Sequence, residues 1–181
     1  MNPRVRIIDE NPRETIKRSF EKIVVNAGIG RMLREPHFED KGFVEIKKEL
    51  GALTGQAPQV RRLRKSLAGF TAREGEPVGL RITLRGAKMV DFFLRLVRIV
   101  MPRVRDFRGI DISNIDAQGV LNLGIREQSV FPEINAEESR TAFSLGVNIV
   151  PKKKNRDLTI ELYRSLGVPL RSESQKKSGT K

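Results

Sequence analysis

The residues in this sequence that are best suited to bind a ligand are cationic side chains clustered in loops. Between Arg61 and Arg73 lie five arginines and lysines and no carboxylate. Clustered cations neutralise the phosphates of nucleic acids, and a glycine such as Gly69 lets a phosphate approach backbone N–H groups. We therefore interpret this segment as a phosphate-binding loop. The alternative is a solvated loop in which Phe70 is a buried anchor.

Two further basic loops follow along the chain. The first carries Arg103, Arg105 and Arg108 around Asp106, and the second carries the lysines of 152–154 with Arg156. Each loop alone is typical of a solvated surface. The whole chain, however, has 35 Lys and Arg against 22 Asp and Glu, a formal charge of +13. This balance favours a polyanionic partner, either a nucleic acid or an anionic membrane surface.

Catalytic and metal-binding patterns are missing from the sequence. Its 181 residues contain no Cys and one His, which excludes disulfides, thiolate zinc sites and cysteine nucleophiles. The lone His37, beside Pro36, has no clustered acids and is a poor catalytic or metal ligand. Gly28 and Gly30 begin a dinucleotide-binding pattern whose third glycine is replaced by Leu33. We predict that the protein is not an enzyme and holds no metal or cofactor.

Strands are predicted where apolar and polar residues alternate. The clearest run is 78–85, in which Val78, Leu80, Ile82 and Leu84 alternate with Gly79, Arg81, Thr83 and Arg85. A second clear run is 143–150, and weaker ones lie at 23–25, 59–64 and 120–126. The first weak run ends in a glycine turn at 26–30.

Helices are predicted where apolar residues recur every three or four positions. Such stripes cover Glu39 to Leu53, Met89 to Val100 and Leu158 to Leu166. Pro102 is expected to end the second helix, because proline lacks the N–H that an interior position requires. Asn155 is expected to cap the start of the third helix. A short helical turn is expected near Arg13 to Phe20.

This order of elements predicts an α+β fold, a two-layer sandwich with a mostly antiparallel sheet. Each helix has one apolar stripe, so the helices are expected on one face of the sheet, leaving the other face open to RNA. We predict an irregular N-terminal arm at 1–20, a single RNA-binding domain at 21–170 and a disordered basic tail at 171–181. Charges interrupt the apolar stretch Met89 to Met101, so no membrane span is expected.

Several motifs together resemble the L-five family of large-subunit ribosomal proteins, in its bacterial form. The central ones read RKSLAGF at 64–70, REGEPVG at 73–79 and TLRG at 83–86. Later ones read PRVRDFRG at 102–109 and LGIREQSVFPEI at 123–134, and earlier ones read NAGIG at 26–30 and TGQ at 54–56. The similarity runs in one order from about Glu21 to Leu170. The turn at 115–121 differs from the family's glycine- and arginine-rich turn.

The resemblance implies a structural protein that binds 5S rRNA and helps attach it in the central protuberance of the large subunit. It also implies contacts with large-subunit rRNA, the P-site tRNA, a small-subunit head protein at an intersubunit bridge, and neighbouring central-protuberance proteins. The protein is then expected to be a monomer within the cytoplasmic ribosome, with no membrane partner. The alternative, from charge alone, is a generic basic module that binds nucleic acid or an anionic membrane surface.

The resemblance and the charge pattern together give three sets of candidate site residues. The predicted 5S rRNA-binding residues are Asn26, Gln56, Arg61, Arg62, Arg81, Thr83 and Arg85. The predicted tRNA-contacting loop contains Lys65, Ser66, Gly69, Phe70 and Arg73. The predicted bridge region contains Arg103, Arg105, Asp106, Arg108, Phe131 and Glu133.

Overall fold

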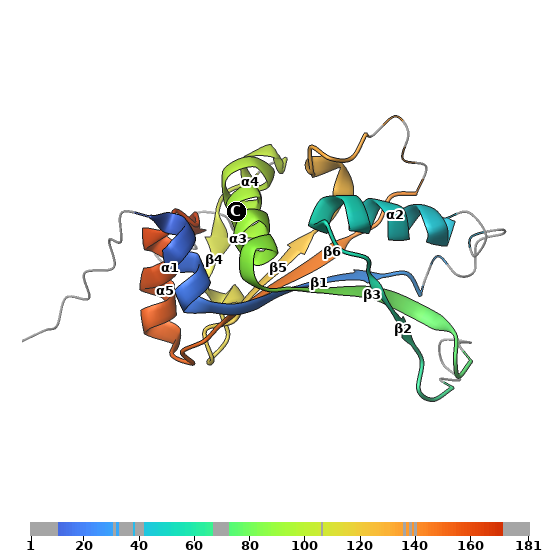
Figure 1. Ribbon diagram of the computed structural model, residues 1–181, viewed down its shortest axis with the longest axis horizontal. Coiled ribbons are helices and arrows are strands. Elements are labelled where there is room, and N and C mark those ends of the chain that lie inside the picture. The colour runs from blue at the N-terminus through green and yellow to red at the C-terminus, as the bar shows by residue number, and fades with distance from the viewer. Residues whose placement is uncertain are drawn as a thin grey trace, which may run out of the picture. The chain divides into compact units, whose positions relative to one another are not determined.

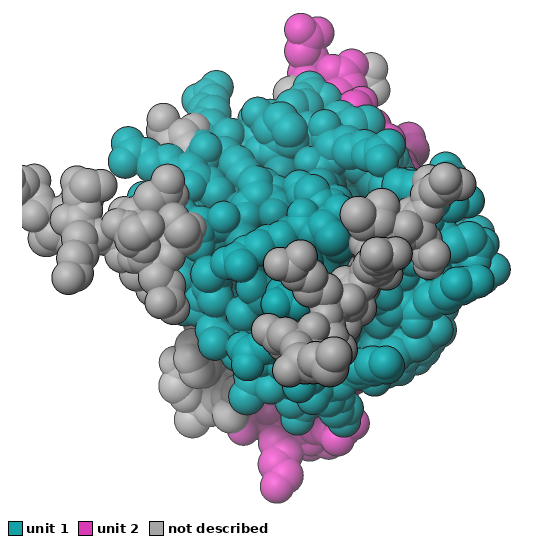
Figure 2. Space-filling view, turned by 90° about the vertical axis from the view of Figure 1, so that its left-hand side faces the viewer, with its two compact units in different colours: residues 1–23, 85–123, 148–181 teal, residues 24–84, 124–147 magenta. Residues whose placement is uncertain are grey.

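A computed structural model of the chain describes residues 11–30, 32, 38, 42–66, 73–105, 107–135, 137, 139 and 141–171 (Figure 1). These residues form two compact units, coloured separately in Figure 2. Unit 1 comprises segments of 1–23, 85–123 and 148–181, and unit 2 comprises segments of 24–84 and 124–147. The chain therefore passes between the units several times, and we describe each unit by itself.

The main sheet has five strands in the order β2-β3-β1-β6-β5. Their bounds are β1 Phe20–Gly28, β2 Gln59–Arg62, β3 Pro77–Leu84, β5 Leu121–Ile125 and β6 Leu145–Pro151. Strands β2 and β3 are antiparallel, with Gln59 opposite Arg81 and Arg61 opposite Gly79. The predicted α+β fold with a mostly antiparallel sheet is confirmed. The single domain predicted at 21–170 stays a prediction.

Unit 2 contains helix α2 (Phe43–Thr54), which packs against β3. Its stripe of Ile46, Leu50 and Leu53 is buried, as the predicted periodicity requires. The helix ends at Gly55, whose left-handed φ of 65° lets its N–H bond to the Gly51 carbonyl at 2.8 Å. The predicted start at Glu39 lies outside the described residues.

Unit 1 is built around Phe20, at the start of β1. Its ring stacks on Phe93 at 5.3 Å between centroids and on Tyr163 at 5.5 Å. These partners belong to α3 (Gly86–Arg95) and α5 (Arg156–Ser165). Helix α1 (Pro12–Ser19) packs against α3 and confirms the helical turn expected near its sequence, so this part of the predicted irregular arm is ordered. The predicted tail lies outside the described residues beyond Arg171.

The helix predicted to stop at Pro102 continues through it. After α3 comes a π-helical turn, η4 (Leu96–Val100), and then α4 (Met101–Arg103). In the π-turn the Met101 N–H bonds to the carbonyl of Leu96, which resets the hydrogen-bonding register just before the proline. Pro102 then occupies the first turn of α4, where no N–H is needed. The expectation of a stop at Pro102 was wrong for this reason.

Helix α5 starts where it was predicted to start. The Asn155 side chain accepts a hydrogen bond from the Leu158 N–H at 3.1 Å, and the helix ends before Gly167. The sequence did not predict the short parallel pair of β4 (Ile110–Asp111) and β7 (Leu170–Arg171), or the 3₁₀ turns η5 (Ile112–Asn114) and η6 (Gln128–Val130).

The glycines of unit 1 give a test of this packing. Gly119 has φ 82°, and a Cβ there would lie 2.5 Å from Thr159 Oγ1, whereas Gly167 has φ 80° and no atom within 4 Å of such a Cβ. We expect Gly119→Ala to cost about 2–4 kcal/mol, from backbone strain and crowding together. Gly167→Ala should cost only the strain, about 1–2 kcal/mol. Urea unfolding of both variants measures the difference, and equal costs would contradict the packing.

Candidate nucleic-acid interface

One face of the sheet in unit 2 carries the polar half of each strand. Leu80, Ile82 and Leu84 of β3 are buried, and α2 packs on that strand (Figure 1). The alternate residues of β3 are only half-buried, whereas Val24, the alternate residue of β1 beside Asn26, is buried. Helix α2 lies on the opposite side of these strands (Figure 1). We call this surface the open face, and its residues are Asn26, Gly28, Gln59, Arg61, Gly79, Arg81, Thr83, Gly124 and Gly146.

The β2–β3 register fixes two arginines on the open face. Because directly opposed residues of an antiparallel pair share a face, the pairs Gln59 with Arg81 and Arg61 with Gly79 lie side by side. Arg61 is exposed, and the Nε of Arg81 is buried without a hydrogen-bond partner in the described structure. This Nε has almost no exposed surface, so a ligand on the open face would contact Arg81 through the accessible part of its half-buried side chain.

Glycines leave one position on each of three strands of the open face without a side chain. Among the described residues, a Cβ built on Gly28 or Gly124 meets no atom within 4 Å, and one on Gly146 meets only the Asn26 carbonyl oxygen at 4.0 Å. None of the three has a positive φ. Neither backbone conformation nor packing among the described residues therefore requires glycine there, and close approach of a ligand is one of the reasons for which strands carry glycine. Gly79 differs, because its Cβ would lie 3.1 Å from the Ala27 carbonyl oxygen.

Two predicted 5S rRNA-binding residues make internal contacts in unit 2. The exposed Gln56 amide donates to the Thr83 carbonyl oxygen at 3.4 Å, which positions it beside β3. Arg62 donates from Nη1 to the Gly75 carbonyl oxygen at 2.8 Å and so stabilises the β2–β3 hairpin. The structure brings Asn26, Arg61, Arg81 and Thr83 onto the open face.

The remaining predicted residue of this set, Arg85, belongs to unit 1. Its Nη1 donates to the Glu21 carbonyl oxygen and carboxylate, both at 3.3 Å, while Lys22 Nζ lies 3.1 Å from the same carboxylate. Hydrogen bonds from Lys22 and then Arg85 hold the pKa of Glu21 below its usual value. The Arg85 side chain is still 57% exposed, so a second anion has access to it.

The described ends of the predicted tRNA-contacting loop are exposed. Lys65, Ser66 and Arg73 lie at the tip of the β2–β3 hairpin, and the Ser66 hydroxyl accepts from the Glu74 N–H at 3.0 Å. Below them the Leu63 N–H bonds to Glu76 at 2.9 Å, which closes the hairpin. Gly69 and Phe70 lie outside the described residues.

The predicted bridge region divides between the two units. Arg103, Arg105 and Arg108 are exposed in unit 1, and Asp106 lies outside the described residues. In unit 2, Glu133 is exposed but Phe131 is only 2% exposed, so its ring packs in the core. Phe131 therefore supports the segment and does not present its ring to a partner.

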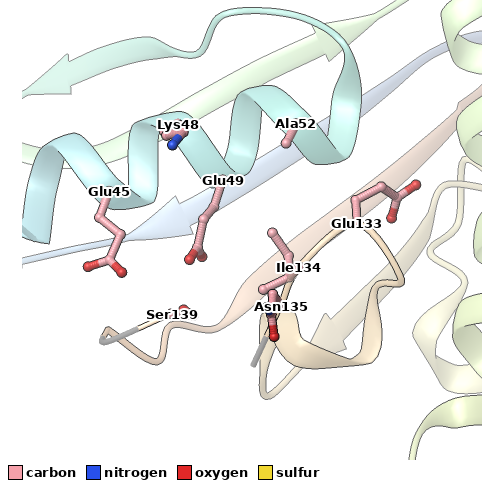
Figure 3. A pocket seen from close by; sticks show the side chains of 8 residues that line it. All are labelled: Glu45, Lys48, Glu49, Ala52, Glu133, Ile134, Asn135 and Ser139. Atoms are coloured by element: carbon pink, nitrogen blue, oxygen red, sulfur yellow. The ribbon is translucent and has the colours of Figure 1, made fainter. Parts of the chain in front are cut away.

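A shallow hollow of about 210 Å³ lies between α2 and the segment after η6 (Figure 3). Glu45, Glu49 and Glu133 line it together with Lys48. The buried side chain of Gln128 stabilises the wall of the hollow through hydrogen bonds. The sequence did not indicate this role. Gln128 donates to Ser139 Oγ at 3.0 Å and to the Thr141 carbonyl at 2.8 Å, and accepts from the Phe143 N–H.

The comparisons with known proteins identify the family. The model of the C-terminus of the ribosomal L5 family matches residues 77–170, which include all of the open face's β3, β5 and β6 residues. The chain is 46% identical to the large ribosomal subunit protein uL5 of Rubrobacter xylanophilus, over 84% of this chain and 83% of that protein. The chain belongs to the ribosomal L5 family. Identity is 38% to the uL5 protein of Halothermothrix orenii (82% and 81% covered) and 42% to that of Anaeromyxobacter sp. strain K (84% and 82%).

Family membership confirms the coarse functional predictions. Proteins of the ribosomal L5 family are structural, non-enzymatic components of the large ribosomal subunit, with rRNA as partner and the cytoplasmic ribosome as location. In the described part of the chain, no helix combines the length and apolar character that crossing a membrane demands. Across those same residues, no group of His, Asp or Glu side chains is arranged to hold a metal ion.

Glu49, in the hollow, gives a pH-dependent test of this part of unit 2. Burial and then the nearby charge of Glu45 raise its pKa above the usual value, against hydrogen bonds from Ser139 and Gln128. A raised folded-state pKa stabilises the fold below the unfolded pKa, and this contribution is lost as pH rises through the folded value. Glu49→Gln should therefore gain thermal stability relative to the parent as pH rises from 4 to 7. Glu133→Gln, at the exposed rim, controls for general charge, and an equal pH trend in both variants would contradict the assignment.

Proposed function

We propose that the open face of unit 2 binds 5S rRNA and that the protein helps attach this RNA in the central protuberance of the large subunit. The observation that carries the proposal is the set of glycines with open space above them on β1, β6 and β5, which continue the face that carries Arg61, Arg81 and Thr83 on β2 and β3. The family's motifs and its place in the large subunit support the choice of RNA as ligand.

The chemistry of the open face suits recognition of a folded RNA by shape. The minor groove of A-form RNA is wide and shallow, displays 2′-hydroxyls and base edges, and is bordered by phosphates. A flat, glycine-lined surface can approach such a groove closely, while side chains at its border reach the sugar and phosphate oxygens. Arginine donates several hydrogen bonds in a fixed fork, so the exposed Arg61 and the half-buried Arg81 suit these acceptors.

The hairpin tip and the bridge region complete the proposal. We assign the tip around Lys65, Ser66 and Arg73 to contact with the P-site tRNA, since its exposed cations need only charge and reach. The exposed Arg103, Arg105, Arg108 and Glu133 are assigned to the neighbourhood of the small-subunit head protein. The protein acts as a monomer among the other proteins of the central protuberance.

Gly124→Val tests the open face. A Cβ at Gly124 meets no neighbour within 4 Å, and a β-branched residue suits a strand, so folding stability should be kept or rise. Affinity for 5S rRNA should fall roughly tenfold, about 1.4 kcal/mol, because the valine holds the RNA away from the sheet. Gly51→Ala on α2, whose added Cβ has only a carbonyl oxygen at 4.0 Å, is the matched control and should bind normally. Wild-type affinity of a folded Gly124→Val variant would refute the interface.

A double variant of the hairpin tip tests the assignment of its cations. Lys65→Gln with Arg73→Gln removes two exposed positive charges without touching the open face. We expect 5S rRNA affinity to change less than threefold in filter-binding assays, whereas retention of P-site tRNA on reconstituted ribosomes should fall. Loss of 5S rRNA binding as large as that of Gly124→Val would show that the tip and the open face act on the same RNA.

A further inference from the structure

A second group of cations lies in unit 1, where two distant parts of the sequence meet. Lys17 stands in the last turn of α1, and Lys152, Lys153 and Lys154 form the turn between β6 and α5. All four residues are exposed. We call them the lysine cluster. The open face does not include it, nor do the motifs quoted above for the family resemblance, although the family model spans Lys152 to Lys154.

Hydrogen bonds fix the two segments of the lysine cluster against each other. The Lys152 N–H donates to the Ser19 carbonyl oxygen at 2.8 Å, and its Nζ donates to the Lys17 carbonyl oxygen at 3.0 Å. Asn155 caps α5 immediately afterwards, which sets the end of the turn. Lys152 thus satisfies carbonyls at the end of α1, and the turn holds Lys153 and Lys154 beside this junction.

The charged groups of Lys17, Lys153 and Lys154 form no ion pair within the described structure. Ion pairs in unit 1 join Arg13 to Asp91, and both Lys22 and Arg85 to Glu21. None of them involves the cluster. Arg156, two positions after Lys154, instead donates inward to the carbonyl oxygens of Ile112 and Ile115. Arg156 therefore stabilises the fold, whereas the lysines face solvent.

We propose that the lysine cluster is a second RNA contact, which binds the phosphate backbone of ribosomal RNA without reading its sequence. Lysine is a compact point charge that suits phosphate, whereas base recognition favours the arginine fork and exposed aromatic rings. The α5 N-terminus adds a partial positive charge next to the turn, in spite of Asp157 in its first turn. The inference rests on the proposed function only for the class of ligand, which is RNA. The surface that binds the RNA is a different one.

The test compares two double variants of the full chain with equal loss of charge. Lys153→Gln with Lys154→Gln removes two adjacent charges from the cluster. Lys47→Gln with Lys48→Gln removes two adjacent exposed charges from α2, where Glu45 and Glu49 stand close in sequence. Affinity is measured against two probes, 5S rRNA alone and protein-free large-subunit rRNA, over a range of salt concentrations. Both variants change exposed side chains, and circular dichroism confirms that they fold.

The cluster variant should lose about three- to thirtyfold in affinity for one of the two RNAs, and the slope of log K against log[salt] should become shallower by roughly 1–2. Loss toward 5S rRNA would place the cluster on the same RNA as the open face, and loss toward large-subunit rRNA alone would place it on a second RNA. Unchanged affinity and slope with both probes, or an equal loss in the α2 variant, would overturn the proposal. So would binding to anionic vesicles that depends on the cluster while RNA binding does not.

The result of the lysine-cluster test can be distinguished from the result of the open-face test. If Gly124→Val binds 5S rRNA normally while the cluster variant does not, the proposed function fails and the lysine cluster stands as an RNA contact. If only Gly124→Val loses binding, the open face stands and the lysine cluster fails.

Discussion

The alternation of side chains along β3 is the constraint on which the proposed interface depends. Burial of Leu80, Ile82 and Leu84 commits one face of the strand to the core of unit 2. Because successive residues of a strand point to opposite faces, Gly79, Arg81 and Thr83 must then point away from that core. A shift of one residue in register would exchange the two sets, so the same apolar contacts that stabilise the sheet also specify what it presents to a ligand.

Net charge alone describes this protein poorly, because its cations have different tasks. Arg62 and Arg156 donate to carbonyl oxygens and stabilise local structure. Arg85 shares its guanidinium with Glu21 yet stays exposed, whereas Lys153 and Lys154 have solvent around them. A protein that binds RNA needs charges that are both accessible and held in place. The hairpin, the open face and the β6–α5 turn each provide such charges by a different structural means.

The sequence predicted the elements whose patterns are local. The alternation in β3, the stripe of α2 and the Asn155 cap of α5 all appear where the residues indicated. It failed where the outcome depends on distant contacts. The π-turn before Pro102, the pairing of β4 with β7 and the buried Gln128 all depend on partners that adjacent residues do not reveal. At the open face the residue types were predicted, but the empty space above its glycines required coordinates.

Site-directed hydroxyl-radical cleavage from the open face tests the central claim most directly. The chain has no cysteine, so a single one introduced at Thr83 carries an iron chelate at a known place. The proposed interface predicts strong cleavage of bound 5S rRNA from position 83 and little from position 44, where the exposed Val44 lies on α2. Equal cleavage from both positions, or cleavage from position 44 alone, would contradict binding through the open face.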